Sequence, residues 1–174
     1  MAQNMEQWSN SDCGRFTPNE WMLVLLGADD AKPILGKTVF VKELFVIGKE
    51  SIADIDDEFE FFPSRYGPYS RHFQPALDSL VREGLVIEKL CAGMTGEKSR
   101  QSRMEYVLTP AGKTVANSLI DRLPEETKLK IHKSKRILSS MGTWGIINYV
   151  YSNYPEYAVL SELIGRRREP FVKY

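Results

Sequence analysis

Seven polar and basic side chains, grouped in two short segments, have the chemistry needed to contact nucleic acid. They are Ser70, Arg71, Gln74, Arg82, Lys98, Arg100 and Arg103. Lys and Arg bind phosphate oxygens whatever the base sequence, whereas Arg and Gln can also hydrogen-bond to base edges. The first four residues lie on or beside a predicted helix, and the last three lie in a predicted loop between two strands. An alternative reading is that Arg71 and Arg82 are ordinary solvated helix residues.

The residue types that bind metals or act as nucleophiles do not occur at the required spacing. Neither His72 nor His132 has a second His, Cys or acidic residue at ligand distance along the chain. The two cysteines, Cys13 and Cys91, are far apart and read as reduced thiols. The sequence therefore predicts no metal site, no cofactor and no enzyme, and a small enzyme is the weakest of three functional hypotheses.

Two further segments imitate ligand-binding motifs. Leu35-Gly36-Lys37-Thr38 matches only the end of a phosphate-binding P-loop and lacks its earlier glycine. The acidic run at 52–60 lacks the glycine and the spaced terminal glutamate of a calcium loop. We expect that run to be a solvated loop leading into a strand at 58–62.

Length and composition indicate an ordinary globular chain. Its 174 residues suffice for one domain, or for one domain with a helical appendage. No apolar run approaches the roughly 20 residues that a membrane helix needs. Residues 1–10 lack the basic and apolar regions of a secretory signal, so the expected location is the cytoplasm.

The net charge is zero but unevenly distributed. Residues 1–63 contain 5 Lys/Arg and 12 Asp/Glu, whereas residues 82–136 contain 12 Lys/Arg and 7 Asp/Glu. Such asymmetry lets a neutral protein present a basic face to an anionic partner. Chance clustering on solvated surfaces explains it equally well.

The elements that must position the seven side chains lie between Phe59 and Gly112. A turn at 69–73 precedes a helix from about Gln74, because Pro75 is tolerated only near a helix start. Gly84 is expected to end that helix in the left-handed conformation. Strands at 85–91 and 104–108 follow, joined by a polar basic loop at 92–103.

Helices are predicted on both sides of this segment. Thr17-Pro18-Asn19-Glu20 is a capping-box start for a buried helix that ends at Gly27. The remaining predictions are a loop at 28–35 and helices at 37–49, 110–122, 124–140, 143–152 and 158–165. The fold class is therefore mainly α with a small β-hairpin (α+β), a winged helix-turn-helix with appended C-terminal helices. The predicted parts are a flexible tail (1–16), the winged-helix domain (17–122) and a helical extension (123–174) that packs on the domain or dimerises.

Several short motifs resemble a known family. They are Gly36-Lys37-Thr38, Lys42-Glu43-Leu44-Phe45, Phe61-Phe62-Pro63-Ser64-Arg65-Tyr66-Gly67-Pro68-Tyr69-Ser70, Tyr149-Val150-Tyr151 and Tyr154-Pro155-Glu156-Tyr157. Together they resemble the small prokaryotic and archaeal winged-helix proteins labelled YwgA-like. They are more distantly similar to the Panacea antitoxin-type domain, which shares the Tyr-Gly-Pro turn before a helix. The resemblance implies a fold and no catalytic residue.

Two functional hypotheses follow. The first is a non-enzymatic regulator that binds duplex DNA as a homodimer through its C-terminal helices. The second is a protein-interaction module, such as an antitoxin-like or defence-associated adaptor. A continuous positive face joining Arg71, Arg82 and the loop at 97–103 would favour DNA, whereas a patchwork of both charges would favour a protein partner.

Overall fold

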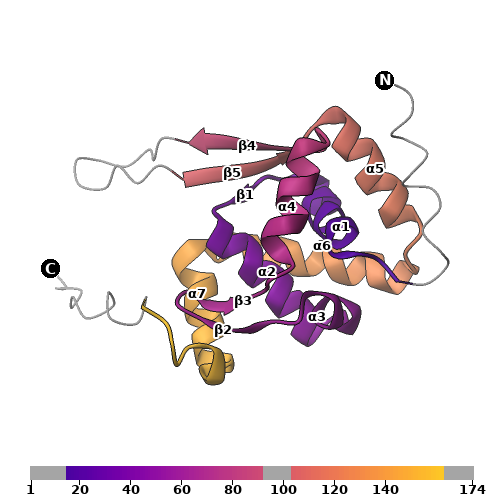
Figure 1. The fold of residues 1–174 in the computed structure, drawn as a ribbon. Coiled ribbons are helices and arrows are strands. Elements are labelled where there is room, and N and C mark those ends of the chain that lie inside the picture. The colour runs from indigo at the N-terminus through magenta and orange to yellow at the C-terminus, as the bar shows by residue number, and fades with distance from the viewer. Residues whose placement is uncertain (1–14, 92–102, 163–174) are drawn as a thin grey trace, which may run out of the picture.

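The computed structural model describes residues 15–91 and 103–162, and helices dominate this part of the chain (Figure 1). The α-helices are α1 (Pro18–Ala31), α2 (Lys37–Glu50), α3 (Ala53–Phe59), α4 (Phe73–Arg82), α5 (Pro110–Asp121), α6 (Glu125–Ser140) and α7 (Gly142–Asn153), and a 3-10 turn, η2, spans Pro155–Tyr157. The strands are β1 (Ile34–Leu35), β2 (Phe62–Ser64), β3 (Gly67–Tyr69), β4 (Val86–Cys91) and β5 (Arg103–Leu108). The mainly α class with a small antiparallel sheet is thus confirmed. None of the described helices has the length and apolar character needed to cross a bilayer.

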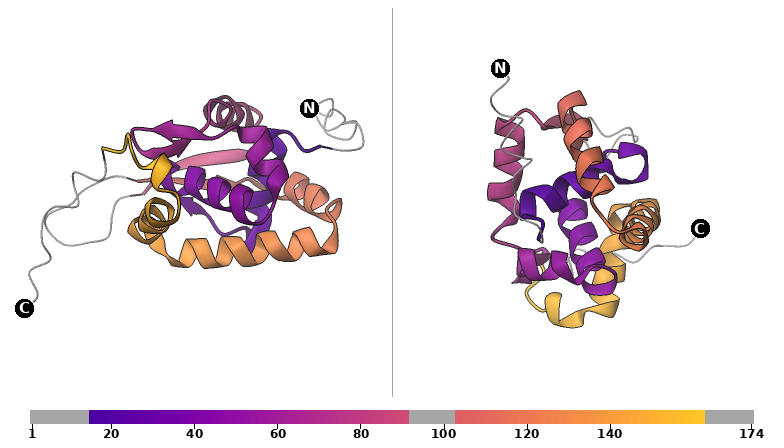
Figure 2. Two further views of the ribbon diagram at one scale, coloured as in Figure 1. Left: turned by 90° about the horizontal axis from the view of Figure 1, so that it is seen from below. Right: turned by 90° about the vertical axis from the view of Figure 1, so that its right-hand side faces the viewer.

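Helices α1 and α2 form the centre of the molecule. The predicted capping box is present at the start of α1, where Thr17 N–H donates to Glu20 Oε2 (2.8 Å) and Glu20 N–H donates to Thr17 Oγ1 (3.3 Å). Every residue from 21 to 26 in α1 and from 39 to 48 in α2 is buried. Such all-round burial requires neighbours on every side, and the other helices supply them (Figure 2).

The larger sheet has the strand order β1-β5-β4 and is antiparallel throughout. The predicted β4–β5 hairpin is confirmed, with Val86 opposite Leu108 and Lys89 opposite Glu105. Strand β1 was expected to be loop, yet Ile34 pairs with Tyr106. Ile34 and Leu35 are too few residues to show the alternation of apolar and polar side chains that marks a strand. Only their pairing with β5 identifies β1.

Helix α4 begins at Phe73 and ends as predicted. Pro75 occupies the third helical position, where a backbone N–H would have no partner within the helix, so the proline costs little. At the other end Gly84 has a φ of +70°, and its N–H bonds to Val81 O (3.0 Å). This left-handed residue turns the chain directly into β4.

The expected strand at 58–62 is wrong, because residues 53–59 form α3. Ile55 and Phe59, one helical turn apart, are both fully buried, so the core selects a helix here. Asp54 and Asp56 lie in the first turn, where acidic side chains favour the positive end of the helix dipole. Glu60 ends α3 in the left-handed conformation, with a φ of 49°.

Two other predicted elements also differ from the structure. The Tyr66-Gly67-Pro68 turn is part of a small β2–β3 hairpin, in which Pro68 lies in β3 opposite Pro63. The helix expected at 158–165 is absent from its described portion, residues 158–162, which follow the short 3-10 turn at Pro155–Tyr157. Residues 163–165 lie outside the described range, as does most of the predicted tail.

Helices α6 and α7 pack on α1 and α2 and share their hydrophobic core. Ile131, Leu138, Ile146 and Val150 are buried in the same cluster as the central helices. The tyrosine-rich end adds to this packing, since the ring of Phe45 in α2 lies 5.0 Å from that of Tyr154 and 4.7 Å from that of Tyr157. Of the two expected roles for these helices, packing on the preceding residues is the one that the structure displays.

Candidate functional site

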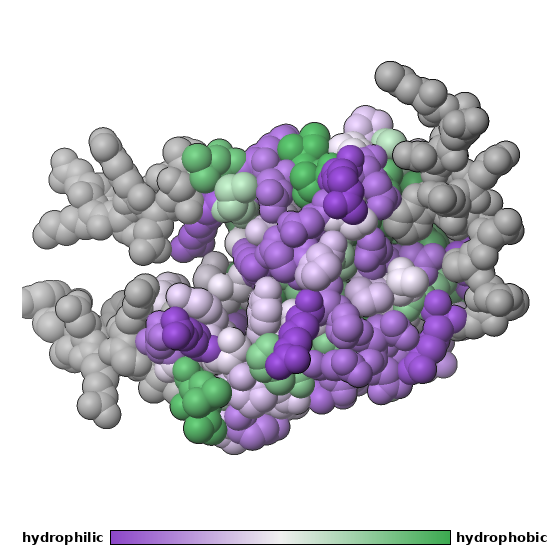
Figure 3. All heavy atoms as spheres, viewed as in Figure 1, coloured by the Kyte–Doolittle hydropathy of each residue, from purple (hydrophilic) through white to green (hydrophobic). Residues whose placement is uncertain are grey.

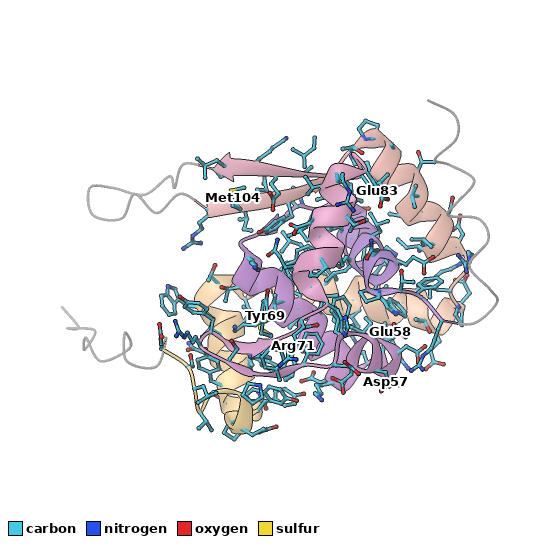
Figure 4. All side chains as sticks on the ribbon, in the orientation of Figure 1. Asp57, Glu58, Tyr69, Arg71, Glu83 and Met104 are labelled. Carbon is cyan, nitrogen blue, oxygen red and sulfur yellow. The ribbon has the colours of Figure 1, made fainter. Side chains whose placement is uncertain are left out.

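The exposed side of α4, next to the β4–β5 hairpin, contains the first group of predicted contact residues (Figure 4). Arg71 precedes the helix and is exposed, and its guanidinium carbon lies 5.6 Å from the centroid of the Phe62 ring. Arg82 is exposed in the last turn and donates to Ser79 Oγ (3.3 Å). Both arginines are therefore free to meet a macromolecule.

Ser70 and Gln74 are less available. Ser70 is fully buried, and its hydroxyl donates to Phe59 O. Ser70 Oγ also accepts from His72 N–H (3.1 Å). Ser70 connects α3 to α4 and has no exposed surface. Its prediction as a nucleic-acid contact is therefore corrected. Gln74 is half-buried and accepts from Lys37 Nζ while donating to Asp78 Oδ1 (2.7 Å).

The second group lies at the end of the hairpin. Arg103 is exposed at the start of β5 and donates to Thr143 Oγ1 of α7 (3.2 Å). Lys98 and Arg100 lie outside the described residues. Of the seven predicted residues, the structure thus presents Arg71, Arg82 and Arg103 on the surface.

Acidic side chains interrupt the positive charges of this face. Asp78 lies between the two arginines along α4, and Glu83 directly follows Arg82; both acids are exposed. Glu60 Oε2 lies 3.2 Å from His72 Nε2 beside the start of the helix. Asp57 of α3, labelled to the lower right of Arg71 in Figure 4, is paired with Arg15. The described face is a patchwork of both signs.

The hairpin continues the mixed character of the surface. Lys89 is opposite Glu105, so the two charges offset one another on the outer side of the sheet. Ile87 and Leu90 are 43% and 69% exposed, and apolar residues lie over the hairpin in Figure 3. The described surface of the hairpin thus combines exposed apolar side chains with charges of both signs.

A buried polar cluster between α1 and α6 is the main feature that the sequence did not reveal. The Lys135 ammonium is fully buried and donates to three backbone carbonyls, Leu26 O (3.0 Å), Ala28 O (2.8 Å) and Lys32 O (2.8 Å). Leu26 lies in the last regular turn of α1, and Ala28 and Lys32 lie beyond it, where carbonyls at the end of a helix lack intrahelical partners. Burial lowers the pKa of Lys135 to about 8, although the Glu43 and Asp29 carboxylates oppose this shift.

Asp29 completes this cluster. Its carboxylate accepts from Arg136 Nε (2.9 Å) and Lys32 Nζ (3.0 Å), and its N–H donates to His132 Nδ1 (2.9 Å). Burial alone would raise the pKa of Asp29, but the hydrogen bonds from the two cations outweigh it and the pKa is lowered. In the sequence, the spacing of residues 132, 135 and 136 places them on one side of a helix, but no pattern says what they meet.

Glu43 is a second buried acid, on α2. Its Oε1 accepts from Ser139 Oγ of α6 (2.9 Å), whereas Oε2 has no hydrogen-bond partner among the described residues. Burial raises the pKa of Glu43 to about 7, and the Ser139 hydrogen bond and the Lys135 charge only partly offset the rise. The neighbouring Lys42 is also buried, donates to Tyr66 O, and has its pKa lowered by burial to about 8.

Within residues 15–91 and 103–162, no group of three or more His, Cys, Asp or Glu side chains is arranged to hold a metal ion. A scan against family models finds no family that matches the chain, and a search of the curated proteins finds no match. The resemblance drawn from short motifs therefore stays a prediction.

Proposed function

We propose that this chain is a non-enzymatic winged-helix protein that binds a protein partner through α4 and the β4–β5 hairpin. The fold assignment is supported by the order α1, β1, α2, α4, β4, β5, which is the helix, strand, helix, helix, hairpin order of winged helices. The α3–β2–β3 segment is then an insertion before the exposed helix. Three of the YwgA-like motifs, at 36–38, 42–45 and 61–70, lie in this region and agree with the proposal.

The charge pattern on α4 is the observation that carries the choice of partner. Duplex DNA has about one negative charge per 1.7 Å of axis, so a DNA-binding helix needs a surface of predominantly positive charge. Here Asp78 and Glu83 accompany Arg71 and Arg82, and Gln74 is already engaged. A protein surface with its own acids and bases complements such a pattern, and like-charged pairs would exclude wrong partners.

Isolation from the native host tests this proposal. Affinity-tagged full-length chain, isolated under mild conditions with a cross-linker, should recover a stoichiometric partner whose cross-links map to α4 and the hairpin. The double variant Arg71→Glu/Arg82→Glu should lose that partner, because both exposed charges are reversed. Lys133→Glu, on the exposed side of α6, is the matched control and should retain it. A chain recovered alone, or cross-links confined to α6, would contradict the proposal.

Duplex DNA is the second candidate, favoured by the exposure of Arg82 and Arg103 beside a helix and hairpin that can enter a groove. Fluorescence anisotropy with a random duplex at low salt tests it. Binding should weaken steeply with added salt, and replacing Lys98, Arg100 and Arg103 with Ala should reduce both affinity and salt slope. Salt-independent or absent binding would leave the protein partner as the only candidate.

We also propose homodimerisation through the C-terminal helices. Tyr149 and Tyr154 each donate to Glu50 Oε1 (2.8 and 2.9 Å) and are thus engaged within the chain. Trp144 is 53% exposed, and Val159 and Leu160 are also largely exposed. These residues supply the apolar surface that a second copy would cover.

A further inference from the structure

A cleft on the side of the molecule formed by α1, α5 and α6 gathers polar groups that have no role in the proposed partner face. It has a volume of about 370 Å³, within the range of small-molecule sites. Its lining residues are Gly27, Asp30, Ala31, Leu108, Lys113, Asn117 and His132. The end of α1 lies against both α5 and α6 in this region (Figure 2).

Three of these side chains have unused bonding capacity. Among the described residues, Asp30 and Lys113 form no ion pair, and the Asn117 carboxamide forms no hydrogen bond; all three are exposed. His132 is half-buried and uses Nδ1 to accept from Asp29 N–H (2.9 Å). A neutral imidazole that accepts at Nδ1 carries its proton on Nε2, so the second nitrogen is a donor.

The backbone that supports Asp30 is strained. Asp29, Asp30 and Ala31 have φ values of 49°, 59° and 54°, so three successive non-glycine residues adopt the left-handed conformation. This conformation is unfavourable because the Cβ atom crowds the carbonyl oxygen. Runs of this kind persist only where the surroundings hold them, and they concentrate at functional sites.

Helix α6 supplies that support. Lys135 fixes the carbonyls of Leu26, Ala28 and Lys32, and Arg136 holds the Asp29 carboxylate. The turn is thus fixed on both sides of Asp30, whose own carboxylate has no partner in residues 15–91 and 103–162. A rigid backbone presenting an unpaired acid is a preorganised contact, since no further ordering is needed on binding.

We infer that this cleft binds a small zwitterion of the α-amino-acid class. Asp30 offers a carboxylate and Lys113 an ammonium. An anion alone would pair only with Lys113 and a cation alone only with Asp30, whereas a zwitterion can pair with both. Asn117 and the Nε2–H of His132 add hydrogen-bonding groups. Leu108 and Ala31 provide an apolar wall for a side chain, and Gly27 contributes no side chain of its own.

Thermal unfolding of the full-length chain tests this inference, with each standard L-α-amino acid at millimolar concentration as the probe. A ligand present well above its Kd should raise Tm by about 5 °C or more. The amide of the protecting amino acid, which lacks the carboxylate, and its deaminated acid, which lacks the ammonium, should each fail to protect.

Two variants locate the effect. Asp30→Asn and Lys113→Gln should each abolish the ligand-dependent rise in Tm relative to the same variant without ligand. Asn tolerates the left-handed conformation and residue 113 is exposed, so both variants are expected to fold. Lys133→Gln, exposed on α6 outside the cleft, should keep the full rise. The inference is overturned if no amino acid protects, if protection survives in either variant, or if a singly charged analogue protects equally.

Discussion

Single buried charges control much of the packing between the first and last thirds of this chain. Lys135 and Glu43 are both fully buried, and each contacts an element far away in sequence. Taking a charge out of water costs several kcal/mol unless hydrogen bonds and opposite charges compensate. Lys135 has three acceptors, whereas one carboxylate oxygen of Glu43 has no donor within the part of the chain that the structure describes. The two residues are therefore expected to respond in opposite ways to substitution.

Replacing Lys135 with Met should destabilise the protein by about 2–4 kcal/mol. The substitution keeps the length of the side chain but leaves the carbonyls of Leu26, Ala28 and Lys32 without their buried donor. Urea unfolding measures the change. Lys133→Met, on the exposed side of the same helix, should change the unfolding free energy by no more than about 0.5 kcal/mol. Equal effects of the two substitutions would show that the carbonyl contacts contribute nothing.

Replacing Glu43 with Gln should make stability less dependent on pH. The pKa of Glu43 is raised from 4.5 to about 7 in the folded state, so between these values the folded protein binds more protons than the unfolded chain. Wild-type stability contributed by this residue therefore falls as pH rises through this window. The variant should gain about 1–3 kcal/mol relative to wild type between about pH 4.5 and about pH 7.

Urea unfolding of both proteins across that window measures the effect. In the wild type, Lys135, whose folded pKa is about 8, changes protonation above the window. The variant lacks the Glu43 carboxylate that raises this pKa, so the two proteins are compared at the acidic end of the window, where Lys135 is protonated in both. If the stability of wild type and of Glu43→Gln changes with pH in the same way, folding does not raise the pKa of Glu43, and the prediction is wrong.

At the scale of elements, the strength of each local signal decided what the sequence could predict. The capping box at Thr17, the hairpin and Gly84 are encoded within a few residues, and all were predicted correctly. Helix α3 was missed because its acidic residues suggested a solvated loop, although Ile55 and Phe59 carry helical spacing. Strand β1 exists only because Ile34 meets Tyr106, a contact that no local pattern encodes.

The candidate site was only partly predictable for the same reason. Exposure of Arg82 follows from helical periodicity, and Arg71 is exposed in the turn before α4; both were identified in the sequence. Burial of Ser70 depends on the Phe59 carbonyl, which α3 brings into place. The cleft beside Asp30 was not predicted at all, because its lining residues come from four elements and its shape depends on a left-handed turn that α6 supports.

Helix α6 should behave as part of the core and not as an appendage. Ile131 is fully buried, whereas Leu129, two residues earlier, is 71% exposed. Ile131→Ala should cost about 2–5 kcal/mol because it leaves a cavity against the central helices, and Leu129→Ala should cost less than about 0.5 kcal/mol. Chemical denaturation of both variants measures the difference. A small effect of Ile131→Ala would indicate that α6 detaches without loss of the core.

At the scale of the whole molecule, the described surface separates into parts with different compositions. The α4 and hairpin face combines exposed arginines, acids and apolar residues, the α1–α5–α6 side contains the polar cleft, and α7 with the residues after it exposes Trp144, Val159 and Leu160. A protein partner, a small ligand and a second copy of the chain would therefore occupy different regions. Each proposal can fail without affecting the others.

The proposed homodimer gives a prediction at this scale. Sedimentation velocity should show a dimer for the full-length chain and a shift towards monomer for Trp144→Ala, because the exposed indole would lose its contact area. Tyr157→Ala is the contrasting variant. Its ring packs on Phe45 within the chain, so it should lower stability before it alters association. A wild-type chain that stays monomeric at high concentration would eliminate this interface.

The contacts of Lys135 have a consequence for the order in which the protein is made. Its bonds to Leu26 and Ala28 span 109 and 107 residues, so the end of α1 is synthesised long before its buried donor leaves the ribosome. Until then the left-handed turn has no support from α6, and the apolar surface of α2 lacks the cover of α6 and α7. Nascent chains of about 120 residues should therefore remain incompletely folded and bind chaperones, with closure delayed until the last third of the protein emerges.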